Sequence, residues 1–111
     1  MIHTMIEKGF YYHYKHDLNE SINNYAYEVV NLGMHSEMHD TPDGVMVIYR
    51  PLYDAFVYKK GKWFDVRPLS MFLENVEKND KIFPRFQKIT DSDTIRKLEE
   101  IKDKMYGKQN I

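Results

Sequence analysis

The 111-residue chain is long enough for one domain, and 42% hydrophobic with 30% charged residues is the balance of an ordinary globular protein. Sixteen basic against seventeen acidic residues leave a formal charge of -1, which disfavours nonspecific nucleic-acid binding through phosphate neutralisation. The lack of cysteine excludes disulfides, thiolate zinc sites and thiol nucleophiles.

Neither a leader nor a membrane span is expected. Residues 1–5 have no apolar signal core, and no apolar run approaches the roughly 18 residues that a spanning helix requires. We therefore expect a cytoplasmic protein without membrane contact. Aromatic residues make up 14% of the chain, which favours a small β-rich fold.

The first half of the chain has the pattern of three strands. Residues 9–15 hold four aromatic residues in five consecutive positions, which predicts a strand. The polar, Asn-rich residues 16–24 predict a loop, and residues 25–34 a second strand with period-two alternation. The Thr-Pro-Asp-Gly sequence at 41–44 predicts a turn. Residues 45–53 then predict a central strand that weakens at Pro51.

The second half mixes strands and helices. Residues 56–58 and 62–67 flank a Lys-Lys-Gly sequence, which predicts a β-hairpin. Apolar residues then recur at helical spacing over residues 68–76, which predicts one or two helical turns near 69–75. A polar turn is expected at residues 77–80 and a further strand over residues 81–89.

A helix is predicted near 92–106. Thr90 and Asp93 have capping-box spacing, and Gly107 is a natural stop. An apolar stripe at helical spacing comprises Ile95, Leu98, Ile101 and Met105. We expect this stripe to dock on the chain's own strands; a homodimer formed through the C-terminal helix is the alternative.

Together these elements predict a mainly β protein with a C-terminal α-helix, formed as a single domain over residues 1–111. The expected core, residues 9–89, is a strongly bent antiparallel barrel of five to six strands, similar to the Src-homology-3 barrel, with residues 90–111 as a helical extension. A flat five-stranded antiparallel sheet with the helix on one face is the alternative.

Short blocks of sequence carry a resemblance to a known family. They are Gly-Phe-Tyr-Tyr-His-Tyr-Lys at 9–15, Tyr-Glu-Val at 27–29, His-Ser-Glu at 35–37, Val-Ile-Tyr-Arg-Pro-Leu-Tyr at 47–53, Val-Arg-Pro at 66–68 with Met71-Phe72, and Pro-Arg-Phe at 84–86. In this order they resemble the bacterial domain of unknown function family 1653 over residues 9–89. The resemblance implies no activity, but it places His13, Lys15, His35, Glu37, Arg50, Arg67 and Arg85 within recurring motifs.

Three of the four arginines stand next to a proline, and two of them precede it. Proline pushes the preceding residue towards extended backbone, so these guanidinium groups are held on strand-like chain. Arginine binds carboxylate or phosphate in a bidentate manner, and tyrosine rings offer stacking faces. The candidate ligand-binding residues are His13, Lys15, His35, Glu37, Arg50, Tyr53, Arg67 and Arg85. The alternative is that each arginine braces the fold through a carboxylate such as Glu28, Glu37 or Asp65, or through backbone carbonyls.

Other chemistry is less well supported by the sequence. His35, Glu37 and His39 would share one face of an extended chain and resemble a metal-ligand set, but a solvated loop before the Pro-Asp-Gly turn is the preferred interpretation. Ser36 lies between His35 and Glu37, on the opposite face of such a chain, so these residues cannot form a catalytic triad. We therefore expect no metal and no cofactor, and assign no catalytic residue.

The leading hypothesis is a non-enzymatic binding module. Its cationic, Tyr-lined groove would hold an anionic or extended partner: an acidic peptide, a nucleotide or single-stranded nucleic acid. One alternative is an enzyme that uses His13 or His35 as general acid or base on an anionic small molecule. The other is an accessory subunit that contacts a protein partner.

Overall fold

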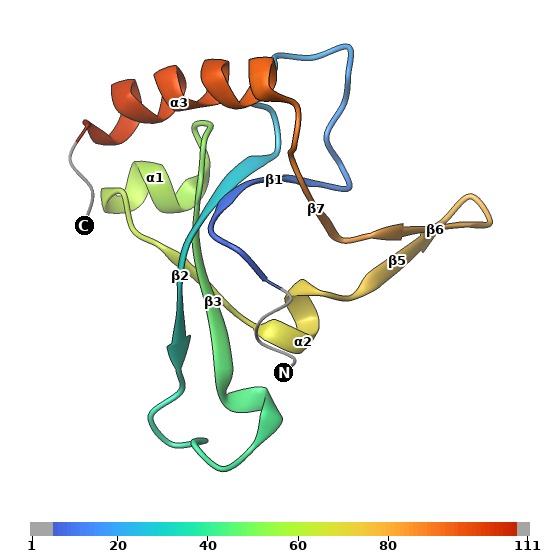
Figure 1. Ribbon diagram of the computed structural model, residues 1–111, viewed down its shortest axis with the longest axis vertical. Helices are drawn as coiled ribbons and strands as arrows, with labels where there is room; N and C mark the ends of the chain where they lie inside the picture. Colours follow the sequence, from blue (N-terminus) through green and yellow to red (C-terminus); the bar gives the residue numbers. More distant parts are fainter. Residues whose placement is uncertain (1–5, 109–111) are drawn as a thin grey trace.

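The computed structural model describes residues 6–108, so residues 1–5, on which the leader prediction rests, lie outside the described residues (Figure 1). The elements in chain order are β1 (Gly9–His13), β2 (Ala26–Met34), the 3-10 helix η2 (Pro42–Gly44), β3 (Val45–Pro51), α1 (Phe56–Gly61), β4 (Asp65–Pro68), α2 (Leu69–Phe72), β5 (Asn75–Lys78), β6 (Lys81–Pro84), β7 (Phe86–Lys88) and α3 (Ser92–Tyr106). None of the helices within residues 6–108 has the length and apolarity needed to cross a membrane.

The strands form two antiparallel sheets. Five of them make the main sheet in the order β4-β3-β2-β1-β7, while β5 and β6 pair only with each other. In the described part of the chain, β4 and β7 each pair with one neighbour, so the main sheet stays open. The predicted closed barrel is therefore not found, and a likeness to the Src-homology-3 barrel is not confirmed. The short β7 and the separate β5–β6 ribbon leave too little strand to close the sheet.

Alternation along the strands divides the core between the two faces of the main sheet, because successive side chains point to opposite sides. On one face, here called the helix face, Phe10, Ala26, Leu52 and Ile89 pack against the fully buried Leu98 of α3. The other face, here called the aromatic face, is built from Ile6, Tyr11, Val29, Val47, Tyr49, Leu69, Phe72 and Phe86. The apolar stripe of α3 is thus used within the chain's own fold.

The predicted hairpin over residues 56–67 is wrong, because residues 56–61 form α1. Lys62 ends this helix in the left-handed conformation (φ 56°); its N–H donates to the Tyr58 carbonyl at 2.9 Å, and the Trp63 N–H donates to the Val57 carbonyl at 3.1 Å. The Tyr58 ring packs edge-on against Tyr106 of α3, with centroids 5.5 Å apart, and its hydroxyl donates to the Met105 carbonyl at 3.4 Å. Packing against α3 favours a helix that strand propensity alone does not predict.

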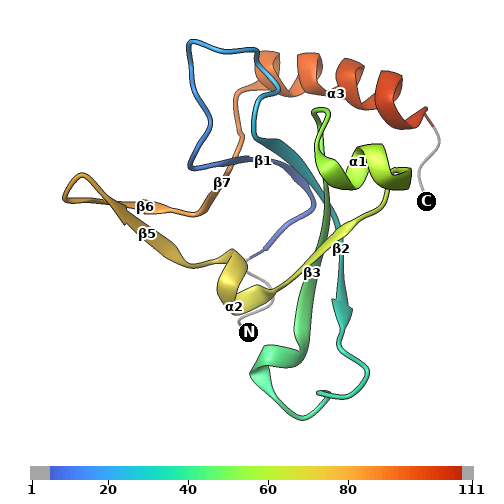
Figure 2. The same cartoon turned by 180° about the vertical axis from the view of Figure 1, so that it is seen from behind.

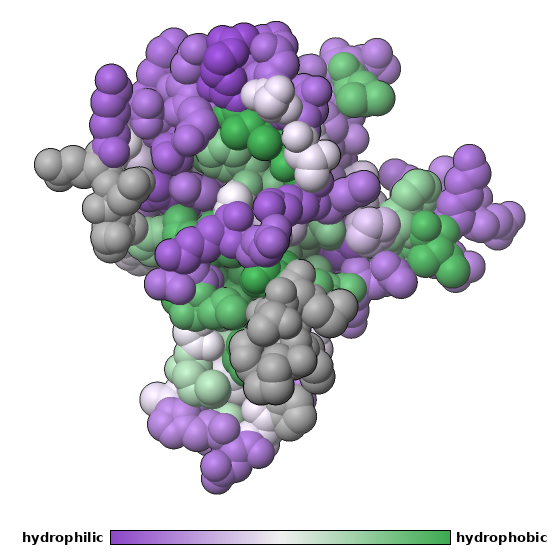
Figure 3. Space-filling model, in the orientation of Figure 1, coloured by the Kyte–Doolittle hydropathy of each residue, from purple (hydrophilic) through white to green (hydrophobic). Residues whose placement is uncertain are grey.

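Residues 73–85 also differ from the prediction. The short helical turn predicted near 69–75 is confirmed as the four-residue α2, but residues 75–84 form the β5–β6 hairpin, which projects from the body of the molecule in both views (Figures 1 and 2). Asn79 and Asp80 both adopt positive φ, 54° and 63°, as a two-residue hairpin turn requires. Ile82 is 69% exposed on this hairpin, whose apolar surface is visible in Figure 3.

The predicted strand over residues 81–89 is divided into β6 and β7 at Arg85. Its N–H donates to the Glu74 carbonyl at 2.8 Å, and its carbonyl accepts from the Tyr14 N–H at 2.9 Å. The backbone of Arg85 therefore joins the hairpin to the end of β1. This change of partner holds the Arg85 side chain beside the aromatic face.

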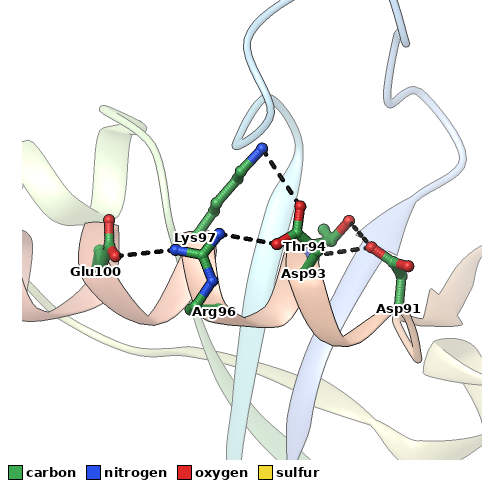
Figure 4. Close-up of polar contacts among 6 residues, drawn as sticks. All are labelled: Asp91, Asp93, Thr94, Arg96, Lys97 and Glu100. Carbon is green, nitrogen blue, oxygen red and sulfur yellow. Dashed lines mark hydrogen bonds and ion pairs between the residues drawn. The ribbon is translucent and has the colours of Figure 1, made fainter.

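The C-terminal helix is confirmed, although its cap differs by one residue from the capping box expected at Thr90. The Asp91 carboxylate accepts from the Thr94 N–H at 2.9 Å and from its hydroxyl at 2.7 Å (Figure 4). On the exposed side, Arg96 pairs with Asp93 at 2.8 Å and Glu100 at 3.4 Å. The expected stop at Gly107 is confirmed, with φ of 84°.

The loop at residues 16–24 is anchored at several points. The Tyr12 hydroxyl donates to the Ile22 carbonyl at 2.5 Å, and the Asn23 amide donates to the Leu52 carbonyl at 2.8 Å. His16 Nδ1 lies 2.7 Å from the Asn24 carbonyl oxygen. These bonds fix the approach of the chain to Tyr25, the residue that precedes β2.

Candidate functional site

His13 ends β1 on the aromatic face. Its ring packs edge-on against Phe86, with centroids 5.1 Å apart, and lies nearly parallel to the ring of Tyr25 at 5.7 Å. Its Nδ1 accepts the N–H of Lys15 at 3.2 Å. Burial lowers the pKa of His13 to about 4, helped by the positive charges of Lys15, Arg85 and Arg67. The imidazole is therefore neutral at pH 7.

Arg67 contacts the same ring of Phe86 on the same face, from β4 at the opposite edge of the sheet. It stands on β4, where its register partner is Val47, and its Cζ lies 5.7 Å from the Phe86 centroid. Its Nε donates to the Tyr49 hydroxyl at 3.1 Å. No carboxylate of residues 6–108 lies within ion-pair distance of this guanidinium, so its contacts are the Tyr49 phenol and the ring of Phe86, over which it lies.

Asp65 lies two residues before Arg67 and therefore on the same face of β4. Burial raises the pKa of the Asp65 carboxyl, and the charge of Arg67 opposes that shift. The charge of Arg67 thus affects the pKa of Asp65, although the two side chains form no ion pair within residues 6–108. This carboxyl is the acidic group that a ligand on this face would meet.

Arg85 contributes a second guanidinium, one donor of which is buried without a partner among the described residues. Its Nη2 binds the Glu74 carboxylate at 3.1 Å, and this pair is partly exposed. Its Nε is buried and has no hydrogen-bond partner among the residues that the structure describes. A buried donor without a partner is unfavourable by about 1–3 kcal/mol. Arg85 therefore braces the hairpin, while its buried Nε–H is without a partner among the described residues.

Tyrosines form the floor beside these cations. The hydroxyls of Tyr27 and Tyr53 are hydrogen-bonded to each other, and burial raises the pKa of both phenols, so they stay neutral. The Tyr25 ring lies 5.6 Å from that of Tyr53. Tyr25 itself has a φ of 52°, a left-handed conformation that is strained for a bulky residue and that is often found at functional sites.

These side chains make up what we call the aromatic–cationic site. Its members are His13, Lys15, Tyr25, Tyr27, Tyr49, Tyr53, Asp65, Arg67, Arg85 and Phe86. Five of the residues predicted from the sequence are among them: His13, Lys15, Tyr53, Arg67 and Arg85. The site combines cations, a neutral imidazole and ring faces, which suits an anionic group attached to a planar or extended partner.

Arg50 is not part of this site, because it points to the opposite face of the sheet. Its Nε donates to the Glu28 carboxylate at 2.8 Å, with the two side chains only 7% and 15% exposed. Its Cζ also lies 4.0 Å from the ring centroid of Tyr106. This arginine joins β2, β3 and α3, as the bracing alternative expected.

His35 and Glu37 lie in the exposed loop between β2 and β3, at the end of these strands far from α3 (Figure 2). The Glu37 N–H donates to His35 Nδ1 at 3.1 Å, and the His35 N–H to the Gly44 carbonyl at 2.7 Å. The structure does not bring them near the aromatic–cationic site. Within residues 6–108, no three His, Asp or Glu side chains lie close enough to hold a metal ion.

Sequence reasoning did not include Tyr25, Tyr27, Tyr49 and Phe86 in the site. Period-two alternation indicates that Tyr25 and Tyr27 share one side of their strand. It does not indicate that this strand pairs with the strand carrying Tyr49, or that Phe86 pairs with His13. Asp65 was considered only as a possible partner for an arginine. Positive φ at Tyr25 has no signal in the sequence.

The fold and the site define a class of protein: an open antiparallel β-sheet with a C-terminal helix on one face and a cationic, aromatic surface on the other. Residues 9–88 match the family model described as protein of unknown function (DUF1653). The chain belongs to this family. Its fold is similar to the crystal structure of a DUF1653 protein from Bordetella bronchiseptica, with a TM-score of 0.57 and 26% identity over 78% of this chain and 90% of that one. The comparison with curated proteins gives no match.

Proposed function

We propose that this protein is a non-enzymatic binding module that holds an anionic partner at the aromatic–cationic site. The observation that carries this proposal is the state of Arg67, which has no carboxylate partner within residues 6–108 and lies over Phe86 beside the neutral His13. A partly buried guanidinium without a counter-charge gains from a carboxylate or phosphate, which its planar donors bind in a bidentate manner.

A run of rings supports a partner that is planar or extended. The ring centroids of Tyr53 and Tyr25 are 5.6 Å apart, those of Tyr25 and His13 5.7 Å, and those of His13 and Tyr14 4.5 Å. Tyr14 in turn lines a hollow of about 280 Å³ at the β5–β6 hairpin, together with Lys78, Asn79, Lys81 and Phe83. Rings interleaved with cations suit a nucleotide, single-stranded nucleic acid or an acidic peptide.

The test is an NMR titration of the ¹⁵N-labelled protein with adenosine monophosphate, inorganic phosphate and adenosine. The proposal expects the monophosphate to bind most tightly, with shifts at His13, Tyr25 and Phe86. Substitution of Arg67 by Gln should weaken binding about tenfold or more, because it removes a charge-assisted bidentate contact. The matched control is Arg96→Gln, which removes an exposed arginine on α3. An acidic peptide titrated in parallel distinguishes the two anion types; no binding of any of these anions would refute the proposal.

The enzymatic alternative keeps only His13 in a chemically suitable place, because His35 lies at the other end of the β2–β3 strands. A pKa of about 4 makes His13 a weak base at neutral pH, whereas general bases work best with a pKa near the operating pH. This is why binding is proposed in preference to catalysis. A bound anion by itself raises the pKa of His13, so only chemical conversion of the bound ligand that is lost in His13→Gln would favour the enzyme instead.

The accessory-subunit alternative would use a different surface. The exposed Ile82 and Phe83 of the projecting hairpin are the observation in its favour, since the apolar stripe of α3 is packed on the main sheet. Sedimentation of the wild type and of Ile82→Lys at increasing concentration tests self-association through this hairpin. A monomer at every concentration removes the homodimer.

A further inference from the structure

A second hollow lies on the helix face of the main sheet, on the side opposite the aromatic–cationic site. It has a volume of about 530 Å³, within the range of small-ligand pockets, which is roughly 300–1,000 Å³. β2, β3, the start of β1 and α3 all contribute to its walls. We call it the back groove. No step of the proposed function uses it.

The floor of the back groove is apolar. Val30, Ile48 and Phe64 line it, from β2, β3 and the segment between α1 and β4. Val30 stands where the register between β2 and β3 shifts, because Val29 pairs with Tyr49 and Asn31 with Ile48. The extra residue of such a bulge is left out of the ladder and bends its strand, and bulges are frequent next to binding sites. The bulge thus forms part of the wall of a groove with an apolar floor.

The polar part of the groove has an excess of positive charge. Lys8, Arg50 and Lys102 line it against one carboxylate, that of Glu28. Glu28 is already neutralised by Arg50 at 2.8 Å and approached by Lys102 at 3.9 Å. Lys102 also pairs with Glu99 at 2.8 Å. Lys8 is exposed and makes no ion pair with any of residues 6–108, so it is the cation that remains available.

We propose that the back groove is a second binding site, for a small ligand that joins an apolar body to one anionic group, such as a medium-chain carboxylate. The apolar body lies on Val30, Ile48 and Phe64, and the anion is held by Lys8 with Arg50 and Lys102 behind it. This assignment rests on the geometry of the helix face alone and is independent of the function proposed for the aromatic face.

The experiment is an NMR titration of the ¹⁵N-labelled protein with octanoate. Acetate serves as a control for the anion alone, and octylammonium carries the same apolar chain with the opposite charge. The expected result is saturable shifts at Val30, Asn31, Ile48 and Phe64 with octanoate, and weak or no shifts with either control. Signals of His13 and Phe86 on the other face should stay in place.

Charge variants make the test specific. Lys8→Glu should weaken octanoate binding about fivefold, as expected for reversing one exposed charge. Lys8→Arg should keep the affinity within about twofold, because it retains the charge. The matched control is Lys104→Glu, which makes the same charge change on an exposed residue of α3 outside the groove. Circular dichroism confirms that each variant is folded.

Three outcomes overturn the proposal: no octanoate shifts at the groove, equal binding of octylammonium, or equal weakening by Lys8→Glu and Lys104→Glu. An Arg67→Gln variant that loses adenosine monophosphate but keeps octanoate shows that the two sites are separate. If the aromatic–cationic site fails to bind anions, the octanoate result stands or falls by itself, because its residues lie on the other face of the sheet.

Discussion

Arg50 and Arg67 show how the two faces of one sheet use the same residue type before proline. Arg50 lies on the helix face, where Glu28 compensates its charge at 2.8 Å and Tyr106 covers its guanidinium. Arg67 lies on the aromatic face of the neighbouring strand, where a phenol and an aromatic ring are its contacts. The motif fixes an extended backbone at both places. The face on which the side chain lies, and not the motif, decides whether the arginine is paired with a carboxylate.

The largest loss of stability is expected in the buried core of the helix face. Leu98 is 0% exposed between α3 and the sheet, so Leu98→Ala should reduce the free energy of unfolding by about 3 kcal/mol through lost burial and a cavity. Urea denaturation measures this. The control Ile82→Ala, at a side chain 69% exposed on the hairpin, should change stability by less than about 0.5 kcal/mol. Equal losses would mean that α3 contributes little to the core.

The next largest change in stability is expected when Arg50 and Arg67 are each replaced. Arg50→Ala should reduce the free energy of unfolding by about 2–3 kcal/mol, because it leaves the Glu28 carboxylate largely buried with only Lys102 nearby. Arg67→Ala should reduce it by about 1 kcal/mol or less, since no carboxylate loses its partner. Urea denaturation of both variants checks the difference. A loss at Arg67 as large as that at Arg50 would show that Arg67 also braces the fold.

The low pKa of His13 should make the stability of the fold depend on pH. Its pKa is about 4 in the folded chain, below the ordinary value of 6.5, because of burial and the nearby cations. The unfolded chain thus binds this proton more readily, so the stability that His13 contributes is fully present above about pH 6.5 and is lost as the pH falls towards 4. An NMR titration of the ring should show this low pKa.

Arg67→Gln is the matched variant for that titration. It removes one of the positive charges near His13, so the pKa of the imidazole should rise towards its ordinary value. Arg96→Gln on α3 should leave it unchanged. A His13 pKa near 6.5 in the wild type would mean that the ring is solvated and that the aromatic face is more open than the contacts with Phe86 and Tyr25 indicate.

The smallest change in stability is expected at Tyr25, whose backbone is strained. Asn tolerates positive φ better than Tyr, so Tyr25→Asn should relieve strain while it removes the contacts with His13 and Tyr53. The net change in stability should stay within about 1 kcal/mol, whereas binding of adenosine monophosphate should weaken. Tyr25→Phe keeps the ring and the strain and should bind as the wild type does. Unchanged affinity in Tyr25→Asn would remove Tyr25 from the site.

Much of the fold follows from local pattern. Alternating aromatic and apolar residues predict β1, β2 and β3, and the capped apolar stripe predicts α3, because both signals depend on neighbours in the sequence. α1 is missed because Phe56, Val57 and Tyr58 have strand propensity, while contacts with α3 at Met105 and Tyr106 stabilise a helix there. β5 is missed because the helical spacing of apolar residues over 68–76 overlaps its first half, and its second half falls in the expected polar turn at 77–80.

The candidate site, like the fold, follows from the sequence only in part. The sequence assigns His13 and Lys15 to one side of the first strand, and it marks Arg50 and Arg67, which precede a proline, as held on extended chain. It does not contain the pairing that brings Arg67 and His13 to the same Phe86 ring, nor the bulge at Val30. His35 and Glu37 were grouped with them by motif, and the length of the β2–β3 strands separates them.

The sequence by itself determined the family, the strand periodicity, the C-terminal helix and the residue types available for anion binding, because each depends on local composition and spacing. The tertiary structure alone decided that the sheet stays open, that Arg50 is compensated and that Arg67 and His13 meet on one face. Strand order and register are set by packing between distant segments, which a period-two pattern does not encode. For this reason the chemistry of the site and part of its membership could be expected from the sequence, whereas the remaining members could not.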